Sequence, residues 1–530
     1  MSHTDDRPPI NPWWIAAAVV VPTFMEVLDT SIANVALRYI AGGLSAAEDD
    51  SEWVITSYLA ANAIVLPLSG WLAAHLGRRN YFLMSILVFT LASGLCGMAG
   101  SLEQLILFRV LQGLAGGGLQ PCSQAVLLDS FPPQKQGAAM TVFGFAALVA
   151  PILGPTLGGY ITDNYEWRWI FYINLPVGGA ALVACFFLLS DPPYLEAERT
   201  RLRSLPLNFD GIGLGLLAVA MVAWEVLLSK GQEWDWLGDP FGRIQILLAA
   251  FLVSGLLLVW RETRFANPVV SLGPLRDRNF VAACVIIFAA YGVLYGQTTS
   301  LPGMLQSLFG YDATTSGLVL SPAGMFAVLL LPVVGLVLGR GMDARWLVVA
   351  GLLLMAAGNY WLAVLNLDIS PGQVVWPRVV LIVGLSMLFA PLNVAAYASI
   401  PKNMRGAAVG LFSLLRNEGG SVGTSVAQTI RDRRLQHHTL RLNEWLDPLN
   451  PNLTGYWTSL RDGFLRLTGD AVGSAQMAWQ SIADTAQRQA LSLAYFDVFW
   501  LFAIIALMLV PLVFLMKRSV AEKGAHLSAE

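Results

Sequence analysis

Fourteen apolar stretches, each about 20 residues long, recur along this chain of 530 residues. A helix needs about 20 mostly apolar residues to cross the hydrocarbon core of a bilayer, so each stretch is long enough to span a membrane. Charged residues make up only 13% of the chain, whereas soluble proteins carry about 25%. We therefore expect an all-α membrane protein with spans over roughly 14–39, 53–74, 80–100, 104–128, 137–161, 168–189, 210–229, 243–260, 279–301, 315–339, 345–366, 377–399, 406–430 and 493–516.

Composition and motifs argue against several other classes of protein. The net charge is −3, which gives no basic surface for nucleic acid. The four cysteines lie in apolar stretches without a CxxC pair, so neither a disulfide framework nor a zinc site is expected. The sequence contains no HExxH, P-loop or GxSxG motif, and we therefore do not expect an enzyme.

Basic residues indicate the orientation of the spans, because Lys and Arg concentrate in the short cytoplasmic loops of membrane proteins. With the N-terminus placed in the cytoplasm, most loop Lys and Arg fall on the cytoplasmic side, for example Arg78 and Arg79. Both termini are then cytoplasmic. Few basic residues fall in short outer segments, namely Arg38, Arg168, Lys230, Arg243 and Arg378.

One outer segment, from residue 431 to residue 492, is long and polar. A structureless loop of this length would be unusual, and we expect an amphipathic helix over 472–492 that continues into the last span. The adjacent His437 and His438 point to different faces of a helix, which favours solvated surface over a metal site. The alternatives for the segment are an adaptor-docking surface and a solvated linker.

Six ionisable residues lie inside the predicted spans, where charge is costly and each such residue is a candidate functional site. Asp29 in the first span and Arg109 in the fourth lie at similar depth, counted at about 1.5 Å per residue along oppositely directed helices. We expect an ion pair if these spans are neighbours, and a carboxylate beside an arginine suits proton coupling. The alternative for Asp29 is a helix cap near the outer surface. The six residues are Glu26, Asp29, Arg109, Glu225, Arg416 and Glu418.

The roles of the other ionisable residues are more open. Glu26 shares a helix face with Asp29, three residues later, and joins the candidate proton-coupling group. Arg416 and Glu418 are two residues apart, so we expect them to face different partners, either in proton coupling or in structural hydrogen bonds between helices. Glu225 has two interpretations. It is a functional residue, or its side chain reaches the outer interface of the membrane, and the second interpretation is the simpler one.

Glycine and proline mark two further segments. In the fifth span, prolines bend the helix and glycines allow close approach of neighbouring helices. This combination suits a pivot in a rocking transporter, and ordinary tight packing is the alternative. The loop after the second span holds Gly70 and Gly77, which suit a tight reversal, and Arg78 and Arg79, which anchor it in the cytoplasm. The fifth-span residues are Pro151, Gly154, Pro155, Gly158 and Gly159.

Six segments combine these residues in longer motifs. They are LDTSIANVAL (28–37), GWLAAHLGRR (70–79), LILFRVLQGLAGG (105–117), APILGPTLGG (150–159), EWRWIFYINLPVG (166–178) and RNEGGSVGTS (416–425). Together they resemble the motifs of the major facilitator superfamily, specifically its fourteen-span drug:proton antiporter branch. Within this branch, the pattern is most similar to the EmrB-type inner-membrane pumps. The loop after the second span departs from the family pattern, because Ala74 stands where an aspartate is usual and His75 replaces the usual basic neighbour.

The resemblance implies a 6+2+6 architecture, in which two six-helix bundles flank two inserted helices. It also implies that Asp29 is the coupling carboxylate of the first span, Arg109 the arginine of the fourth, and the Pro–Gly segment of the fifth span the antiporter motif. The implied divisions are a cytoplasmic N-terminus 1–13, an N-terminal bundle 14–189, inserted helices with linkers 190–278, a C-terminal bundle 279–516 that includes the periplasmic loop 431–492, and a cytoplasmic tail 517–530.

By the same resemblance, we expect a proton-coupled exporter of hydrophobic or amphipathic compounds in the bacterial inner membrane, driven by the proton gradient without a cofactor. Expected partners are the lipid bilayer, a periplasmic membrane-fusion adaptor and an outer-membrane channel. The alternatives are export of a specific metabolite or fatty acid, or an importer or sensor on the same fold, since a fold does not fix direction. Polar residues of the first, second and fourth spans would line the cavity of an exporter. They are Glu26, Asp29, Asn34, Tyr58, Asn62 and Gln112.

Overall fold

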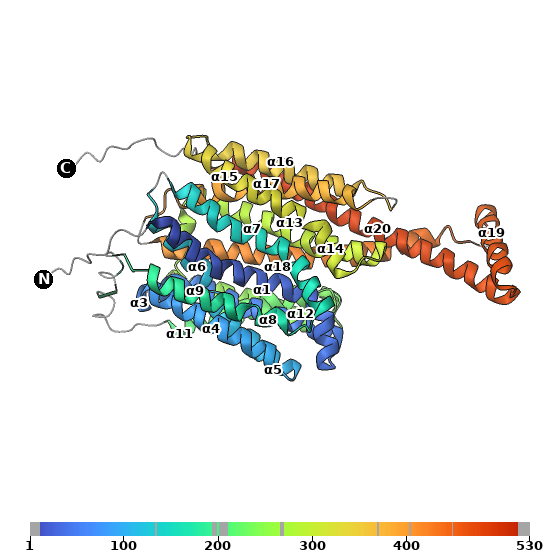
Figure 1. The fold of residues 1–530 in the computed structure, drawn as a ribbon, viewed down its shortest axis with the longest axis horizontal. Coiled ribbons are helices and arrows are strands. Elements are labelled where there is room, and N and C mark those ends of the chain that lie inside the picture. Colours follow the sequence, from blue (N-terminus) through green and yellow to red (C-terminus); the bar gives the residue numbers. More distant parts are fainter. Residues whose placement is uncertain are drawn as a thin grey trace.

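The computed structural model is a bundle of long helices, most of which run from one end of the molecule to the other (Figure 1). It describes residues 11–132, 135–192, 195, 199–200, 210–265, 270–367, 370–401, 404–447 and 449–517, and these residues contain no strand. The all-α prediction is confirmed for this part of the chain. The predicted terminal segments lie outside the described residues at 1–10 and 518–530, as does 201–209 of the predicted linker before the inserted helices.

Several of the helices begin where a side chain offers an acceptor for free backbone N–H groups. Asp210, Asp277 and Asp343 each accept a backbone N–H of the helix that follows, at 2.8, 2.9 and 3.2 Å. The bounds are α1 Pro12–Leu44, α2 Glu48–Ser51, α3 Trp53–Leu76, α4 Arg78–Met98, α5 Leu102–Gly116, α6 Leu119–Ser130, α7 Gln136–Asn164, α8 Trp169–Tyr172, α9 Asn174–Leu188, α11 Gly211–Lys230, α12 Arg243–Glu262, α13 Arg278–Phe309, α14 Ala313–Leu320, α15 Pro322–Gly339, α16 Ala344–Ala363, α17 Pro371–Tyr397, α18 Arg405–Asn443, α19 Pro451–Thr468 and α20 Ala471–Val513.

Twelve helices among the described residues are long and apolar enough to cross a membrane. The two other predicted spans fall on α5 with α6, and on α18. The first is broken at Gly117 and Gly118, where side chains would collide with α3 and α4, because a Cβ would lie 2.8 Å from the Asn62 carbonyl and 2.5 Å from the Tyr81 hydroxyl. Helix α18 covers the other predicted span, 406–430, and continues beyond it into polar sequence up to Asn443. The total of fourteen spans stays a prediction.

On either side of the inserted pair α11 and α12, the helices form two groups, α1 to α9 and α13 to α20. The groups meet where α3, α6 and α7 of the first pack against α14, α15, α17 and α18 of the second. The two inserted helices, α11 and α12, differ in their contacts with these groups. Helix α11 packs against α3 from the first group and α18 from the second, as well as against α12. Helix α12 is mostly exposed, and only 11% of its most apolar stretch of 18 residues is buried inside the protein. Helix α11 therefore forms part of the wall between the groups. The predicted domain boundaries stay predictions.

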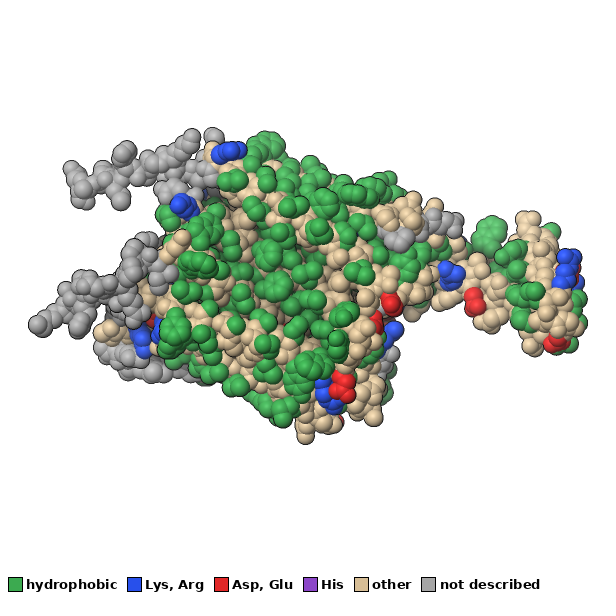
Figure 2. Space-filling view, viewed as in Figure 1, with side chains coloured by type: hydrophobic (Ala, Val, Ile, Leu, Met, Phe, Trp, Pro, Cys, Tyr) green, Lys and Arg blue, Asp and Glu red, His purple; other side chains and the backbone are tan. Residues whose placement is uncertain are grey.

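The side of the bundle is covered with apolar side chains, and the visible charged residues lie toward its two ends (Figure 2). Large exposed hydrophobic residues are numerous on α4, α9 and α12, for example Phe187, Ile246 and Leu256. A soluble protein rarely exposes such a continuous apolar surface, whereas a bilayer requires one. The first and last described residues lie at one end of the bundle, opposite a projecting helical segment (Figure 1).

The projecting segment consists of the end of α18, α19 and the beginning of α20, and we call it the arm (Figure 1). The expected helix over 472–492 is confirmed, because α20 runs without interruption from Ala471 into the last span. The extension of α18 to Asn443 was not predicted. His438 is also not merely solvated, because its Nε2 lies 2.8 Å from Asp497 of α20. The described residues contain no cluster of three metal ligands.

Two basic residues that we assigned to short outer segments are in fact buried. Arg378 lies inside α17 with 1% of its surface exposed and donates to Gln297 and, at 2.8 Å, to Thr298. Lys230 ends α11, where its ammonium lies 3.2 Å from Glu52 and 2.5 Å from Glu233. The orientation argument counted both as solvated loop residues, because sequence alone places helix ends only to within several residues.

Candidate functional site

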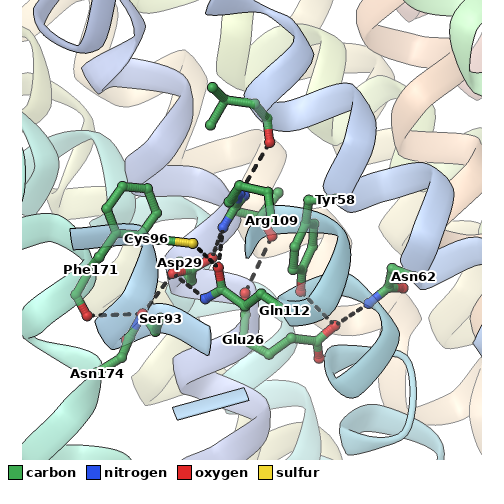
Figure 3. Close-up of polar contacts among 12 residues, drawn as sticks. Glu26, Asp29, Tyr58, Asn62, Ser93, Cys96, Arg109, Gln112, Phe171 and Asn174 are labelled. Carbon is green, nitrogen blue, oxygen red and sulfur yellow. Dashed lines mark hydrogen bonds and ion pairs between the residues drawn. The ribbon is translucent and has the colours of Figure 1, made fainter. Parts of the chain in front are cut away.

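A buried ion pair connects the first helix with the fourth predicted span (Figure 3). Asp29 of α1 is 3% exposed and Arg109 of α5 is 0% exposed. Arg109 Nη1 lies 2.5 Å from Asp29 Oδ2, which confirms the pairing expected from their depths. Asp29 Oδ1 accepts further hydrogen bonds from Gln112, at 3.0 Å, and from Asn174 of α9, at 2.7 Å. The carboxylate of α1 is thus held by two other helices, α5 and α9.

Arg109 is fixed on its other sides as well. Its Nε donates to the carbonyl of Val54 at 3.1 Å, and its Nη1 also donates to Gln112 at 2.9 Å. The guanidinium lies over the ring of Tyr58, 4.3 Å from the centroid, where a cation is attracted by the aromatic face. Removal of one charge from such a buried pair leaves the other uncompensated, which is strongly unfavourable. The charge state of Asp29 therefore affects how α1, α5 and α9 pack.

Glu26 points away from this pair, toward α3 (Figure 3). Its Oε1 accepts a hydrogen bond from Asn62 at 3.1 Å and lies 3.5 Å from the Tyr58 hydroxyl. The other carboxyl oxygen, Oε2, is buried without a partner in the described part of the chain. Glu26 and Asp29 are both buried but face different surroundings, so the candidate proton-coupling residues form two separate groups.

A cavity of about 150 Å³ lies beside Glu26, between the two groups of helices. Its wall combines apolar side chains with a few polar groups, as in most small-molecule sites. The predicted residues Glu26, Asn34, Tyr58 and Asn62 line it, whereas Asp29 and Gln112 do not, and Gln112 belongs to the Asp29 pair. The lining also includes Val27, Thr30, Leu37, Ile55, Leu59, Gln120, Glu225, Leu228, Tyr295, Asn417, Ser421 and Ser425.

The far wall of the cavity brings together two acidic residues that are distant in the sequence. Glu225 of α11 accepts a hydrogen bond from the Ser421 hydroxyl of α18 at 3.1 Å, and it lies within hydrogen-bonding reach of Glu418. Both are buried, with exposures of 3% and 6%. The interpretation that Glu225 reaches the outer interface is therefore wrong. Arg416 donates instead to Gln120 of α6, which confirms that it and Glu418 face different partners.

The Pro–Gly segment of α7 packs directly against α1. Pro155 has no N–H to donate to the carbonyl of Pro151, and the Ser31 hydroxyl of α1 donates to that carbonyl at 3.1 Å. A side chain at Gly154 would collide with Ser31, because a Cβ would lie 2.1 Å from its Oγ. At Gly158 a Cβ would lie 3.3 Å from the Cα of Ile32. Close approach therefore requires glycine at Gly154, and Pro151 and Gly159 are buried in the same segment.

The loop after α3 matches its predicted role only in part. Gly77 makes the tight reversal with a φ of +89°, which favours glycine. Arg78 pairs with Asp129 at the end of α6, and the backbone N–H of Arg79 donates to Asp191 at 2.8 Å. Gly70 does not belong to the reversal. It lies inside α3 where α18 crosses, since its Cβ would be 2.8 Å from the backbone of Gly406.

Sequence reasoning missed several buried polar residues at the centre of the bundle. Asn174 lies in the quoted segment 166–178 but was given no role. Gln124 of α6 donates to Asn393 of α17 at 2.6 Å, across the two groups of helices. Arg378 was assigned to a loop. A polar residue inside an apolar stretch was the available signal for Gln124 and Asn393. We applied this signal to the ionisable residues and to the proposed cavity residues of the first, second and fourth spans, but not to these two.

Comparison with known proteins places these features in context. The sequence profile of the Major Facilitator Superfamily matches residues 21–424. The Multidrug export protein EmrB of Escherichia coli (strain K12) is 36% identical over 96% of each chain. The Fatty acid resistance protein FarB of Neisseria gonorrhoeae is 34% identical over 95% of this chain and 96% of that protein. The fold is similar to the proton:xylose symporter XylE, with a TM-score of 0.59 at 12% identity over 95% of each chain.

Proposed function

The chain belongs to the major facilitator superfamily and is an EmrB-type member of it, and from this premise we propose that it is a proton-coupled exporter of hydrophobic or amphipathic drugs. The superfamily consists of transporters, so the protein moves compounds rather than converting them. The proposed location is the bacterial inner membrane, with both termini in the cytoplasm and the arm in the periplasm. The proton gradient supplies the energy, and no cofactor is required.

The observation that carries the proposal is the buried Asp29–Arg109 pair next to a cavity that it does not line. Protonation of Asp29 removes the negative charge that balances Arg109, so the protonated and ionised forms favour different packing of α1 against α5 and α9. Glu26, one helical turn earlier on α1, lines the cavity. A rearrangement of α1 at Asp29 therefore changes the cavity, which is the coupling that an antiporter requires.

Flux measurement in inverted membrane vesicles tests this function and its direction. We expect a fluorescent hydrophobic drug to accumulate in inverted vesicles when the vesicle interior is made acidic, because the former cytoplasmic side then faces the medium. Dissipating the proton gradient should stop the accumulation. Uptake that needs no gradient, or drug movement only in right-side-out vesicles, would contradict proton-coupled export. FarB is named for fatty acid resistance, so a fatty acid belongs in the same assay as the second candidate substrate.

We further propose that the arm docks the periplasmic adaptor of a tripartite pump, which continues through an outer-membrane channel. Large apolar side chains are exposed on it, including Trp445, Leu449, Leu467 and Val472, which are 70–87% exposed. Exposed apolar groups of this size on a polar segment are typical of protein interfaces. The arm helices also contact each other through Trp457 and Trp479, whose ring centroids are 6.0 Å apart. This contact gives the surface a defined shape.

Charge placed on the apolar surface of the arm should abolish adaptor capture. The variant Leu449→Asp with Leu467→Asp changes two of its most exposed apolar residues and no buried group. We expect pull-down of the adaptor from detergent-solubilised membranes to fall by about tenfold or more, as loss of an interface anchor does. The matched control, Ser459→Asp with Gln476→Asp, adds the same charge at exposed polar sites. Equal capture by both variants would contradict docking through the apolar residues.

A further inference from the structure

Glu225 and Glu418 form a carboxyl pair that connects the inserted helix α11 to α18 of the C-terminal group. Glu225 lines the cavity and accepts a hydrogen bond from Ser421 of α18. Glu418 precedes Ser421 by three residues and so lies on the same face of α18, within hydrogen-bonding reach of Glu225. The Ser421 hydroxyl holds Glu225 in place at 3.1 Å, and the Ser425 hydroxyl ties α18 to the Leu228 carbonyl of α11 at 2.7 Å. The pair is thus built into the contact between these two helices.

The surrounding charges leave this pair without a counter-ion. Lys230, on the same helix as Glu225, is engaged by Glu52 and Glu233. Arg416 of α18 is directed toward Gln120. Within the described residues, neither Glu225 nor Glu418 has an ion-pair partner, and one Glu418 oxygen has no hydrogen-bond partner. The other titratable groups around the cavity are Glu26 on α1, Glu52 before α3, Tyr58 on α3 and Tyr295 on α13.

Two carboxyl groups in contact cannot both be ionised at low cost inside a protein, because like charges repel strongly away from water. A hydrogen bond between them also requires a proton, since an ionised carboxylate only accepts. One proton shared between the two groups satisfies both conditions and leaves a net charge of −1. Such a pair takes up and releases protons as a unit.

The cavity next to the pair is suited to a cation. Its described lining contains three carboxylates, Glu26, Glu52 and Glu225, and no lysine or arginine. Glu26 lines the cavity, and one of its carboxyl oxygens is buried without a hydrogen-bond partner among the described residues. The aromatic rings of Tyr58 and Tyr295 and several aliphatic side chains complete the wall. Glu52 is paired with Lys230, so Glu26 and Glu225 are the carboxyl groups left to interact with a ligand. Aromatic faces and carboxylates together bind organic cations, whereas an anion would be repelled by these two groups.

We propose that Glu225 and Glu418 share one proton in the empty transporter and release it when a lipophilic organic cation occupies the cavity. This inference rests on the proposed function and assigns amphipathic cations as its substrate class. The exchange balances in charge, because the pair changes from −1 to −2 as one positive charge enters and one proton leaves. The inserted helix α11 then takes part in coupling, and the pair is a second proton site in addition to Asp29.

Proton release on ligand binding tests the proposal with the full chain in detergent. The probe is tetraphenylphosphonium, and tetraphenylborate, of nearly the same size, supplies the opposite charge. In weakly buffered solution with a pH dye, we expect about one proton released per cation bound, and affinity that falls about tenfold for each pH unit of acidification over that range. Tetraphenylborate should release none. Binding of the cation without proton release, no binding of the cation, or equal binding of the two probes would each overturn the proposal.

Variants separate this site from Asp29. Glu225→Gln and Glu418→Gln should each abolish proton release, and Glu418→Asp should restore part of it, since the aspartate keeps the carboxyl. Glu166→Gln, an exposed site outside the cavity, is the matched control and should release protons normally. Asp29→Asn should stop transport but retain the release. Normal proton release in both Gln variants would refute the proposed role of the Glu225–Glu418 pair. In that case, gradient-driven export of an uncharged drug by the same preparation would still support the proposed function.

Discussion

Asparagine in place of Asp29 is expected to abolish proton-driven export while the protein stays folded. The substitution removes the group that takes up the proton but keeps an amide of nearly the same shape beside Arg109, Gln112 and Asn174. In the proposed transport cycle Asp29 becomes neutral when it takes up a proton, so we expect the fold to tolerate a neutral side chain there. We expect gradient-driven flux in vesicles to fall to the background level. The melting temperature should fall moderately, because Arg109 loses its counter-charge but keeps hydrogen-bond acceptors.

The mode of failure distinguishes a coupling residue from a structural one. Asp29→Asn resembles the protonated state, so exchange of drug down its own gradient should persist when proton-driven flux is lost. Asp29→Ala should behave differently, because it removes the whole carboxyl group that pairs with the buried Arg109. The guanidinium keeps its neutral acceptors, the Val54 carbonyl and Gln112, but loses its counter-ion, which costs about 3–5 kcal/mol. Asp484→Asn on the arm is the control for the same chemical change at an exposed site. Full proton-driven efflux by Asp29→Asn would refute the assignment.

The Asp29–Arg109 contact could be predicted because both residues lie on long regular helices. The rise per residue converts sequence position into depth, and two charges at equal depth in a bilayer have few alternatives to pairing. The prediction that Gln112 lines the cavity was wrong. Gln112 lies three residues after Arg109 and so faces the same side of α5. This spacing indicates that Gln112 belongs with the Asp29–Arg109 pair.

The cavity and the carboxyl pair could not be predicted, because a sequence does not specify which helices are neighbours. Glu225 and Glu418 are separated by 193 positions, and only the packing of α11 between α3 and α18 brings them together. Arg378 illustrates a different limit. In the 6+2+6 arrangement, α17 is the fourth helix of its half, as α5 is of the first, and Arg378 meets Gln297 of α13 as Arg109 meets Asp29 of α1. Its partner is neutral, so this contact offers no carboxylate for a proton.

Alanine in place of Gly154 should separate α1 from α7 and impair both stability and transport. The added Cβ would lie 2.1 Å from Ser31 Oγ and 2.4 Å from Ser31 Cβ, so one helix must shift. Overpacking of a tight contact costs about 1–3 kcal/mol. The Ser31 hydroxyl would also lose its hydrogen bond to the Pro151 carbonyl, which Pro155 leaves without a donor. We expect a lower melting temperature and reduced flux, because α7 also packs against α14, α15 and α17 of the opposite group.

A second substitution shows whether this contact is the cause. Ser31→Gly removes both atoms nearest the new methyl group, so Gly154→Ala with Ser31→Gly should recover stability relative to Gly154→Ala alone. The two substituted residues are in contact, so the effects of the substitutions on stability should be non-additive. Gly179→Ala in α9 is the matched control, because no atom lies within 4 Å of its added Cβ. An equal loss of melting temperature in Gly154→Ala and Gly179→Ala would mean that backbone flexibility, and not the close contact of α1 with α7, is what Gly154 provides.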